Sequence, residues 1–277
     1  MSRWLLIITL QKYSISQKKY LQSQKDFLIQ QRVVSSKLMA VDLSKAWQHS
    51  HQLFETGLLK LTGLAKVTLT EEGRVKKTNP NIYLDFNAIG KGYAVDVISS
   101  VMDNQFGYSN TLVEIGGELH AKGKNILKNS QWTVAIDAPN INPDERELLR
   151  TLKLENQALA TSGNYRKYRI DDAGNKVVHT INPLNGTAKP SKVLSASVVA
   201  GDCMTADAYA TALMSMPLSM LEERSIEGIE YMLIFAGEDG SYDFRLSPKF
   251  PSLNLPFYKQ EWFHLMEKHS AVDPLAL

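Results

Sequence analysis

Apolar and polar residues alternate along much of this chain in short runs that end at glycine, asparagine or aspartate. Such alternation is typical of half-buried strands, and two runs around a glycine-containing turn are typical of a hairpin. The pattern predicts hairpins over 66–77, 165–181 and 231–247. It predicts further strands over 81–86, 111–123, 131–139, 158–165 and 195–201, the fourth of which stops in a Ser-Gly turn.

Two segments have helical rather than strand spacing. The first covers 88–102, and the second covers 203–216 and ends before a proline, which cannot continue a helix. The predicted apolar face of the first helix consists of Ile89, Tyr93, Val97 and Val101. Because strands outnumber helices and many are joined as hairpins, we expect an α+β fold with a largely antiparallel sheet and packed helices.

The first part of the chain differs in character from the remainder. Residues 1–62 are rich in Gln, Ser and Lys and only weakly helical, so we expect an atypical N-terminal segment, 1–62, before the domain 63–277. The opening MSRWLLIITL lies at the short limit of a secretory apolar region, about 7–15 residues, and no small-residue cleavage site follows. A strand or helix start is the favoured interpretation, with an unusual export signal as the alternative.

Composition narrows the class of protein. The chain has 277 residues, 44% of them hydrophobic and 22% charged, as expected for a globular protein with a sizeable core. Its net charge is only +2 and no basic stripe with interleaved aromatic residues occurs, which argues against a nucleic-acid partner. The single cysteine, Cys203, excludes an internal disulfide and a cysteine-rich zinc site.

The second predicted helix carries a carboxylate among apolar neighbours. Asp207 and Thr211 are four residues apart, so they lie one above the other on a face shared with Cys203, Ala210 and Met214. A carboxylate in such surroundings is costly unless it is paired or binds a metal. Asp207 therefore either caps a backbone or meets a lysine, or it joins Thr211 as an oxygen ligand of a hard cation such as Mg²⁺.

Two turn regions offer further polar groups. His179 ends a predicted strand before an Asn-Pro turn, where it is either a general base or a structural hydrogen-bonding residue. Thr161, Ser162 and Gly163 form a predicted turn that presents hydroxyl and N–H donors suited to a phosphate, the alternative being a plain turn.

The stretch DFNAIGKGYAVD, at 85–96, matches neither a Walker A loop nor GxGxxG. Asp85, the carbonyl near Ala88 and Lys91 can nevertheless surround an anion and its counter-ion. A lysine in the first turn of a helix opposes the helix dipole unless it has a negative partner, and we expect a ligand to be that partner. Gly116 and Gly117 interrupt a predicted strand, which indicates a β-bulge or a flat ligand close to the backbone.

Six stretches in this order resemble the ApbE family of FAD:protein FMN transferases: LDFNAIGKGYAVD, LVEIGGELHAKG, AIDAP, ALATSGNYRKY, HTINPLNGTAKP and SVVAGDCMTADAYATALMSM. The resemblance extends from about residue 63 to about residue 245. It implies a T-fold-like single domain that uses Mg²⁺ to cleave FAD, attaches FMN through a phosphoester to Thr or Ser of a target protein, and releases AMP. The targets it implies are subunits of redox complexes of the Nqr or Rnf type, or flavin reductases.

The resemblance also assigns roles to residues of this chain. It implies Mg²⁺ ligation by Asp207, Thr211 and the Ala88 carbonyl, and a base at His179. The FAD contacts that it implies are Asp85, Lys91, Gly116, Gly117, Thr161, Ser162, Gly163 and Ile181.

This chain also departs from the family pattern in several places. Asn182 stands where the family has Asp, Glu114 stands where Asn is common, and residues 1–60 lack the family's earlier motif. These departures make an FAD-binding but weak or inactive protein the alternative. The resemblance implies the periplasmic face of the inner membrane, although no lipid-attachment cysteine follows the N-terminal apolar run.

Overall fold

The structure is a computed structural model of the chain. It describes residues 61, 63–70, 72, 74–82, 84, 86–139, 147–163, 168–170, 176–178, 193–216, 226–237 and 241–251. Within these ranges, no helix is both long enough and apolar enough to span a membrane.

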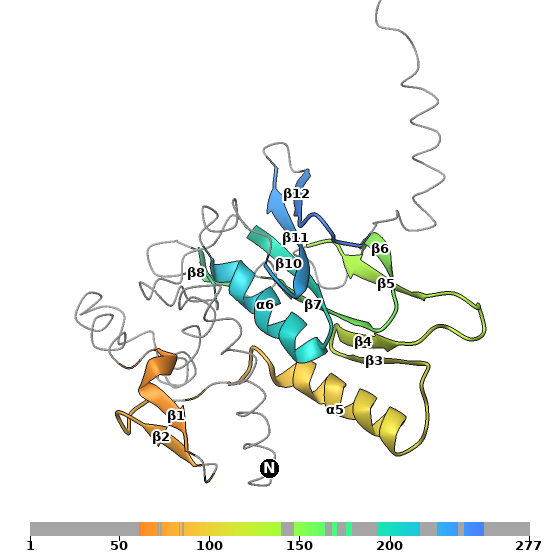
Figure 1. Ribbon diagram of the computed structural model, residues 1–277. Helices are drawn as coiled ribbons and strands as arrows, with labels where there is room; N and C mark the ends of the chain where they lie inside the picture. Colours follow the sequence, from red (N-terminus) through yellow and green to blue (C-terminus); the bar gives the residue numbers. More distant parts are fainter. Residues whose placement is uncertain are drawn as a thin grey trace, which may run out of the picture.

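A six-stranded sheet forms the centre of the fold (Figure 1). Its strands are, in spatial order, β12 (Tyr242–Leu246), β11 (Ile229–Ala236), β10 (Val193–Ala200), β7 (Gln157–Gly163), β4 (Glu118–Lys122) and β3 (Thr111–Ile115). Every neighbouring pair in this sheet is antiparallel. The predicted α+β class with a largely antiparallel sheet is therefore confirmed.

Two helices, α5 (Gly90–Asn104) and α6 (Cys203–Ser215), lie against one face of this sheet. Alternate strand residues, such as Ala160 and Val198, pack toward α6. The strand residues that alternate with these, such as Leu159 and Val199, point to the other face and pack toward a second antiparallel pair, β5 (Trp132–Asp137) and β6 (Leu148–Leu154). Because successive strand residues point to opposite faces, the sheet separates a helical layer from this strand pair.

The remaining described elements are short. The first is a 3₁₀ turn, η2 (Leu64–Lys66), followed by the antiparallel pair β1 (Val67–Leu69) and β2 (Val75–Lys77). A second pair consists of β8 (Tyr168–Ile170) and β9 (Lys176–Val178). The hairpins predicted over 66–77, 165–181 and 231–247 are confirmed, whereas β6 had no predicted counterpart.

The strand predicted over 81–86 is wrong for its described residues, since Ile82, Leu84 and Phe86 belong to no strand. The Lys77 ammonium instead donates hydrogen bonds to the carbonyl oxygens of Pro80, at 2.9 Å, and Ile82, at 2.7 Å. A lysine side chain thus satisfies two backbone carbonyls of this region in place of a neighbouring strand.

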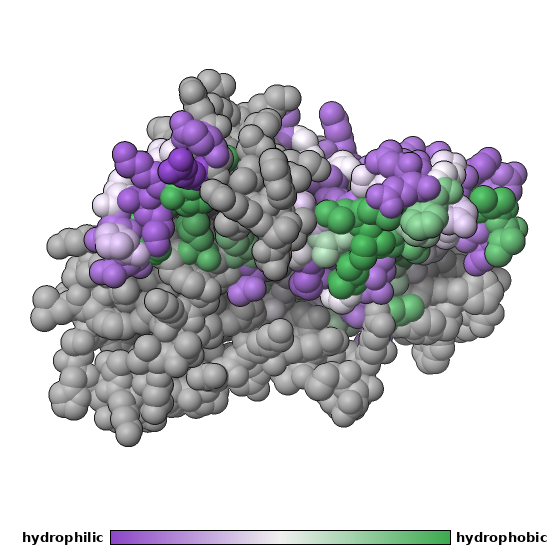
Figure 2. All heavy atoms as spheres, turned by 90° about the horizontal axis from the view of Figure 1, so that it is seen from below, coloured by the Kyte–Doolittle hydropathy of each residue, from purple (hydrophilic) through white to green (hydrophobic). Residues whose placement is uncertain are grey.

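The first helix begins at Gly90, two residues later than predicted, and it buries a different face. Its buried positions are Gly92, Val95 and Ser99, whereas Val97 is 37% exposed. The predicted face is therefore right for Ile89, which is 4% exposed, and wrong for Val97. Gly92 makes the close backbone contact with α6. The exposed apolar residues of α5 and the segment after it are Val97, Ile98, Phe106 and Tyr108. Figure 2, which shows the molecule from below the view of Figure 1, has exposed apolar residues (green) interspersed with hydrophilic ones (purple) on that face.

Gly116 and Gly117 form the turn between β3 and β4, with φ values of +63° and +101°. Residues with side chains rarely adopt this region of backbone space, which explains the glycine pair. The predicted interruption of one strand is therefore a hairpin turn, and the strand predicted over 111–123 is two strands.

Candidate functional site

The first turn of α5 is completed by a carboxylate from α6. The residue at the N-cap of α5 is Ile89, which has no side-chain oxygen to accept from the free N–H groups of the first turn. The Gly92 N–H instead donates to Asp207 Oδ2 at 3.0 Å, and Asp207 is only 3% exposed. The negative charge thus lies at the positive end of the helix dipole. Backbone capping, one of the roles that the sequence left open for Asp207, is therefore present.

The same region receives two further predicted metal ligands. Ala88 lies in the turn that leads into α5, four residues before Gly92. Thr211 follows Asp207 by one helical turn, is 7% exposed, and shares a hydrogen bond of 3.2 Å with the Ser162 hydroxyl on β7. The structure therefore brings Ser162 to Thr211 across the interface of α6 and the sheet.

Thr161 and Ser162 are adjacent in sequence but face opposite sides of the sheet. Thr161, Ser162 and Gly163 are the last residues of β7 and pair with β10, so the Ser-Gly turn predicted for them is wrong. Whereas Ser162 contacts α6, the Thr161 hydroxyl bonds Ser197 on β10 at 2.8 Å. The sheet therefore separates Thr161 from the helical side that carries Asp207.

Lys91 pairs with a buried carboxylate that the sequence analysis did not identify. Its ammonium lies 2.5 Å from Glu118 Oε1; the Lys91 side chain is 50% exposed and the Glu118 side chain only 2%. A Cβ placed on Gly116 would lie 3.8 Å from the Lys91 Cδ, so the hairpin turn lies against this pair. The lysine that opposes the helix dipole thus has a partner within the protein, where we expected a ligand to be that partner.

Two opposing effects act on the pKa of the Glu118 carboxyl. Burial raises the pKa of its carboxyl above the ordinary value, while the hydrogen bond and charge of Lys91 act in the opposite direction. Its second oxygen, Oε2, is buried and has no hydrogen-bond partner among the described residues. Its position directly after two glycines is a sequence signal for Glu118, whereas its burial and its pairing with Lys91 depend on the fold.

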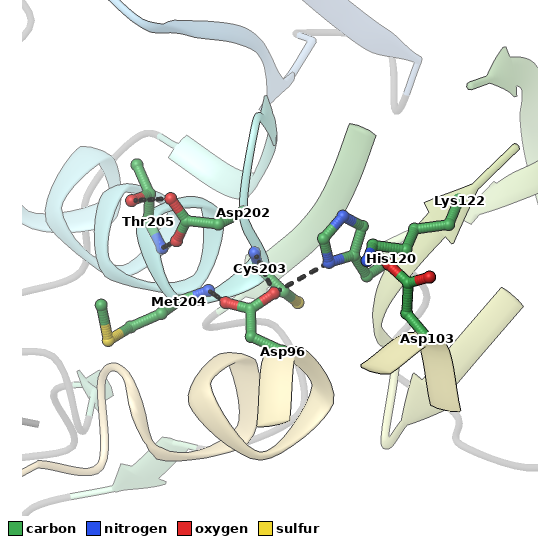
Figure 3. A network of polar contacts seen from close by, with 8 residues as sticks. All are labelled: Asp96, Asp103, His120, Lys122, Asp202, Cys203, Met204 and Thr205. Atoms are coloured by element: carbon green, nitrogen blue, oxygen red, sulfur yellow. Dashed lines mark hydrogen bonds and ion pairs between the residues drawn. The ribbon is translucent and has the colours of Figure 1, made fainter. Parts of the chain in front are cut away.

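A second group of polar contacts joins α5, β4 and α6 (Figure 3). The Asp96 carboxylate accepts from the backbone N–H groups of Cys203 and Met204 and contacts His120, each at 2.9 Å. Burial, followed by the charge of Asp96, raises the pKa of the Cys203 thiol far above its ordinary value. Cys203 is therefore a protonated core residue, as its lack of exposure also indicates.

The donors at this site suit a hard cation. Among the described residues there is no cluster of three or more His, Cys, Asp or Glu side chains, so this set is not a multi-carboxylate or thiolate site. Asp207 offers a carboxylate, Thr211 a hydroxyl and Ala88 a backbone carbonyl, all oxygen donors of the kind that Mg²⁺ prefers. Asp85, His179 and Ile181 lie outside the described residues, so their predicted roles stay predictions.

The family model described as "ApbE family" matches residues 38–233. The chain belongs to the ApbE family. The match begins within the segment 1–62, and the domain boundary predicted at residue 63 stays a prediction.

This ApbE-family chain is similar to proteins named FAD:protein FMN transferase. It is 35% identical to one from Vibrio cholerae over 199 residues, which cover 70% of this chain and 57% of that protein. It is 31% identical to one from Escherichia coli over 195 residues, 69% of this chain and 54% of that protein. The chain thus spans little more than half the length of these relatives.

The fold agrees with the family. A solved structure named as the flavin transferase ApbE from Vibrio cholerae has a TM-score of 0.65 to this chain at 26% identity, covering 90% of this chain and 76% of the other. The α+β architecture observed here is therefore the ApbE fold.

Proposed function

We propose that this protein is a Mg²⁺-dependent FAD:protein FMN transferase. A Thr or Ser hydroxyl of a target protein attacks the FMN phosphorus of FAD, forming a P–O bond as the bond to the bridging oxygen breaks. FMN is left on the target as a phosphoester, and AMP departs with the bridging oxygen. The hydroxyl proton passes to a base, for which His179 is the candidate.

The observation that carries this proposal is the junction of Asp207 with the start of α5. The Gly92 N–H bond ties Asp207 to the first turn of α5, which Ala88 precedes, and Thr211 lies one turn after Asp207 on α6. Lys91, half-exposed, is the residue before Gly92. Bound Mg²⁺ would supply charge neutralisation on the diphosphate oxygens. The Lys91 ammonium, half-exposed although it is paired with Glu118, would offer a further positive charge to an anionic ligand. Of the FAD contacts that the resemblance implies, Gly116 lies near the Lys91 side chain and Ser162 bonds to Thr211, whereas Thr161 faces the other side of the sheet.

The partner that we propose is a flavin-carrying subunit of an Nqr- or Rnf-type complex or a flavin reductase. A location at the periplasmic face of the inner membrane belongs to the same proposal. Detection of the protein in the periplasmic fraction of its host would support that location, and retention in the cytoplasmic fraction would contradict it.

The test is incubation of the full chain with FAD, Mg²⁺ and a recombinant Nqr-type flavin-carrying subunit. We expect the subunit to become fluorescent on a denaturing gel as AMP is released in equal amount. Asp207→Ala is expected to abolish both signals, and Asp103→Ala on the outer part of α5 to retain them. FAD binding without AMP release would favour the alternative, a flavin-binding protein without transferase activity.

A further inference from the structure

The N-terminal turn of α6 has its free N–H groups satisfied from two sources. Asp202, the N-cap residue, accepts from the Thr205 N–H at 2.8 Å. The two preceding N–H groups, those of Cys203 and Met204, donate to the two oxygens of Asp96, which lies on α5. A carboxylate from another helix therefore completes the cap of the helix that carries Asp207 and Thr211.

The position of Asp96 is fixed from a third side. His120 Nδ1 on β4 lies 2.9 Å from Asp96 Oδ1, within hydrogen-bond distance. Asp96 and His120 are 15% and 12% exposed, so these contacts are largely shielded from water. Figure 3 shows the Asp96 carboxylate between the first turn of α6 and the His120 ring.

The helices also leave no room to slide past each other. A Cβ built on Gly92 would come within 2.3 Å of the Cys203 carbonyl oxygen, so the two backbones are in direct contact there. On the same side of α5, the Gly92 N–H holds Asp207 Oδ2. Rotation or translation of the α6 N-terminus would therefore move Asp207 away from the turn that contains Ala88.

We propose that Asp96 is a positioning residue for the cation site, holding the N-terminus of α6 so that Asp207 and Thr211 meet the start of α5. It acts through backbone N–H groups and touches no proposed ligand atom. The proposal rests on the proposed function in one respect, namely that Asp207 and Thr211 bind the cation. Outer residues that orient metal ligands typically affect metal affinity by about 10–100-fold.

The experiment compares Asp96→Asn with Asp103→Asn in the full chain. Asp103 is the matched control because it lies on the same helix and also pairs with β4, through Lys122 at 2.6 Å. Within the described part of the chain, its side chain makes no hydrogen bond or ion pair to α6. Binding of Mn²⁺, a probe for oxygen-ligand sites, is measured by electron paramagnetic resonance. Thermal unfolding with and without Mn²⁺ gives a second readout.

We expect Asp96→Asn to weaken Mn²⁺ binding at least tenfold, because an amide can accept only one of the two N–H bonds well. Asp103→Asn should remain within twofold of the unsubstituted protein. The rise in unfolding temperature caused by Mn²⁺ should shrink for Asp96→Asn alone. A purely structural role would lower the unfolding temperature without metal and leave the Mn²⁺ affinity unchanged, and that result would overturn the proposal.

Two other outcomes are also decisive. If Asp96→Asn does not fold, Asp96→Glu is measured by the same criteria, since it keeps both acceptors but displaces them by one methylene. Failure of both variants to fold would refute a positioning role, because Asp96 would then be a requirement of folding itself. If the unsubstituted protein binds no Mn²⁺, the cation site of the proposed function fails, a result distinct from equal binding by all variants.

Discussion

Substitution of Gly92 by alanine tests the closeness of α5 and α6. The added Cβ would lie 2.3 Å from the Cys203 carbonyl oxygen, 2.6 Å from its carbon and 2.8 Å from the Met204 Cα. All three are backbone atoms that no rotamer change can move. Overpacking of this kind costs about 1–3 kcal/mol, and rigid neighbours place this case near the upper value.

The helix propensity of alanine offsets part of that cost. Alanine is favoured over glycine in a helix by about 1 kcal/mol, which leaves a net loss in the free energy of unfolding of about 2 kcal/mol. Displacement of α5 would also weaken the bond from the Gly92 N–H to Asp207, so this value is a lower limit. For a domain of this size we expect the unfolding temperature to fall by about 4–8 °C.

The matched control is Gly90→Ala, two residues earlier on the same helix, where a Cβ would meet nothing within 4 Å. Its unfolding temperature should equal or slightly exceed that of the unsubstituted protein. Scanning calorimetry of both variants is the assay. If Gly92→Ala unfolded at the same temperature as Gly90→Ala, the close contact of the two helix backbones would be refuted.

Two other substitutions probe the buried acid and the two faces of β7. Because burial raises the folded-state pKa of Glu118, its stabilising contribution is fully present below the unfolded pKa and is lost as the pH rises through the folded pKa. As the pH is raised from 4 to 8, the free energy of unfolding of Glu118→Gln, measured in urea, should therefore increase relative to that of the unsubstituted protein. A difference that does not change with pH would contradict this. Ser162→Ala removes the partner of the Thr211 hydroxyl and should weaken Mn²⁺ binding, whereas Thr161→Ala, on the opposite face, should not; equal effects would contradict the assignment of faces.

Periodicity in the sequence predicted the elements whose patterns are local. The alternating runs at 66–77 and 231–247 became hairpins, and the second predicted helix became α6 almost to the residue. The segment 148–154, LLRTLKL, forms β6 although its apolar residues do not alternate regularly. Its pairing with β5 decides its structure, and single-segment patterns do not contain that information.

The candidate site was predictable only in part, for the same reason. Asp207 and Thr211 were identified because a carboxylate on an apolar helix face conflicts with its neighbours. Glu118 and Asp96 were missed because their roles depend on partners from other elements, Lys91 for Glu118 and the start of α6 for Asp96. The spacing of Thr161 and Ser162 suggested one turn, but strand pairing places their side chains on opposite faces.

Each of the helices α5 and α6 has its first turn capped by a carboxylate of the other, which has a consequence for synthesis on the ribosome. The acceptor of the Gly92 N–H is Asp207, which lies 115 residues later in the chain. At a translation rate of about 5–20 residues per second, this acceptor is synthesised about 6–23 s after Gly92. During that interval the first turn of α5 lacks its cap, so the helix should remain frayed at its start. The face of α5 that packs on α6 should stay exposed to chaperones until α6 has emerged.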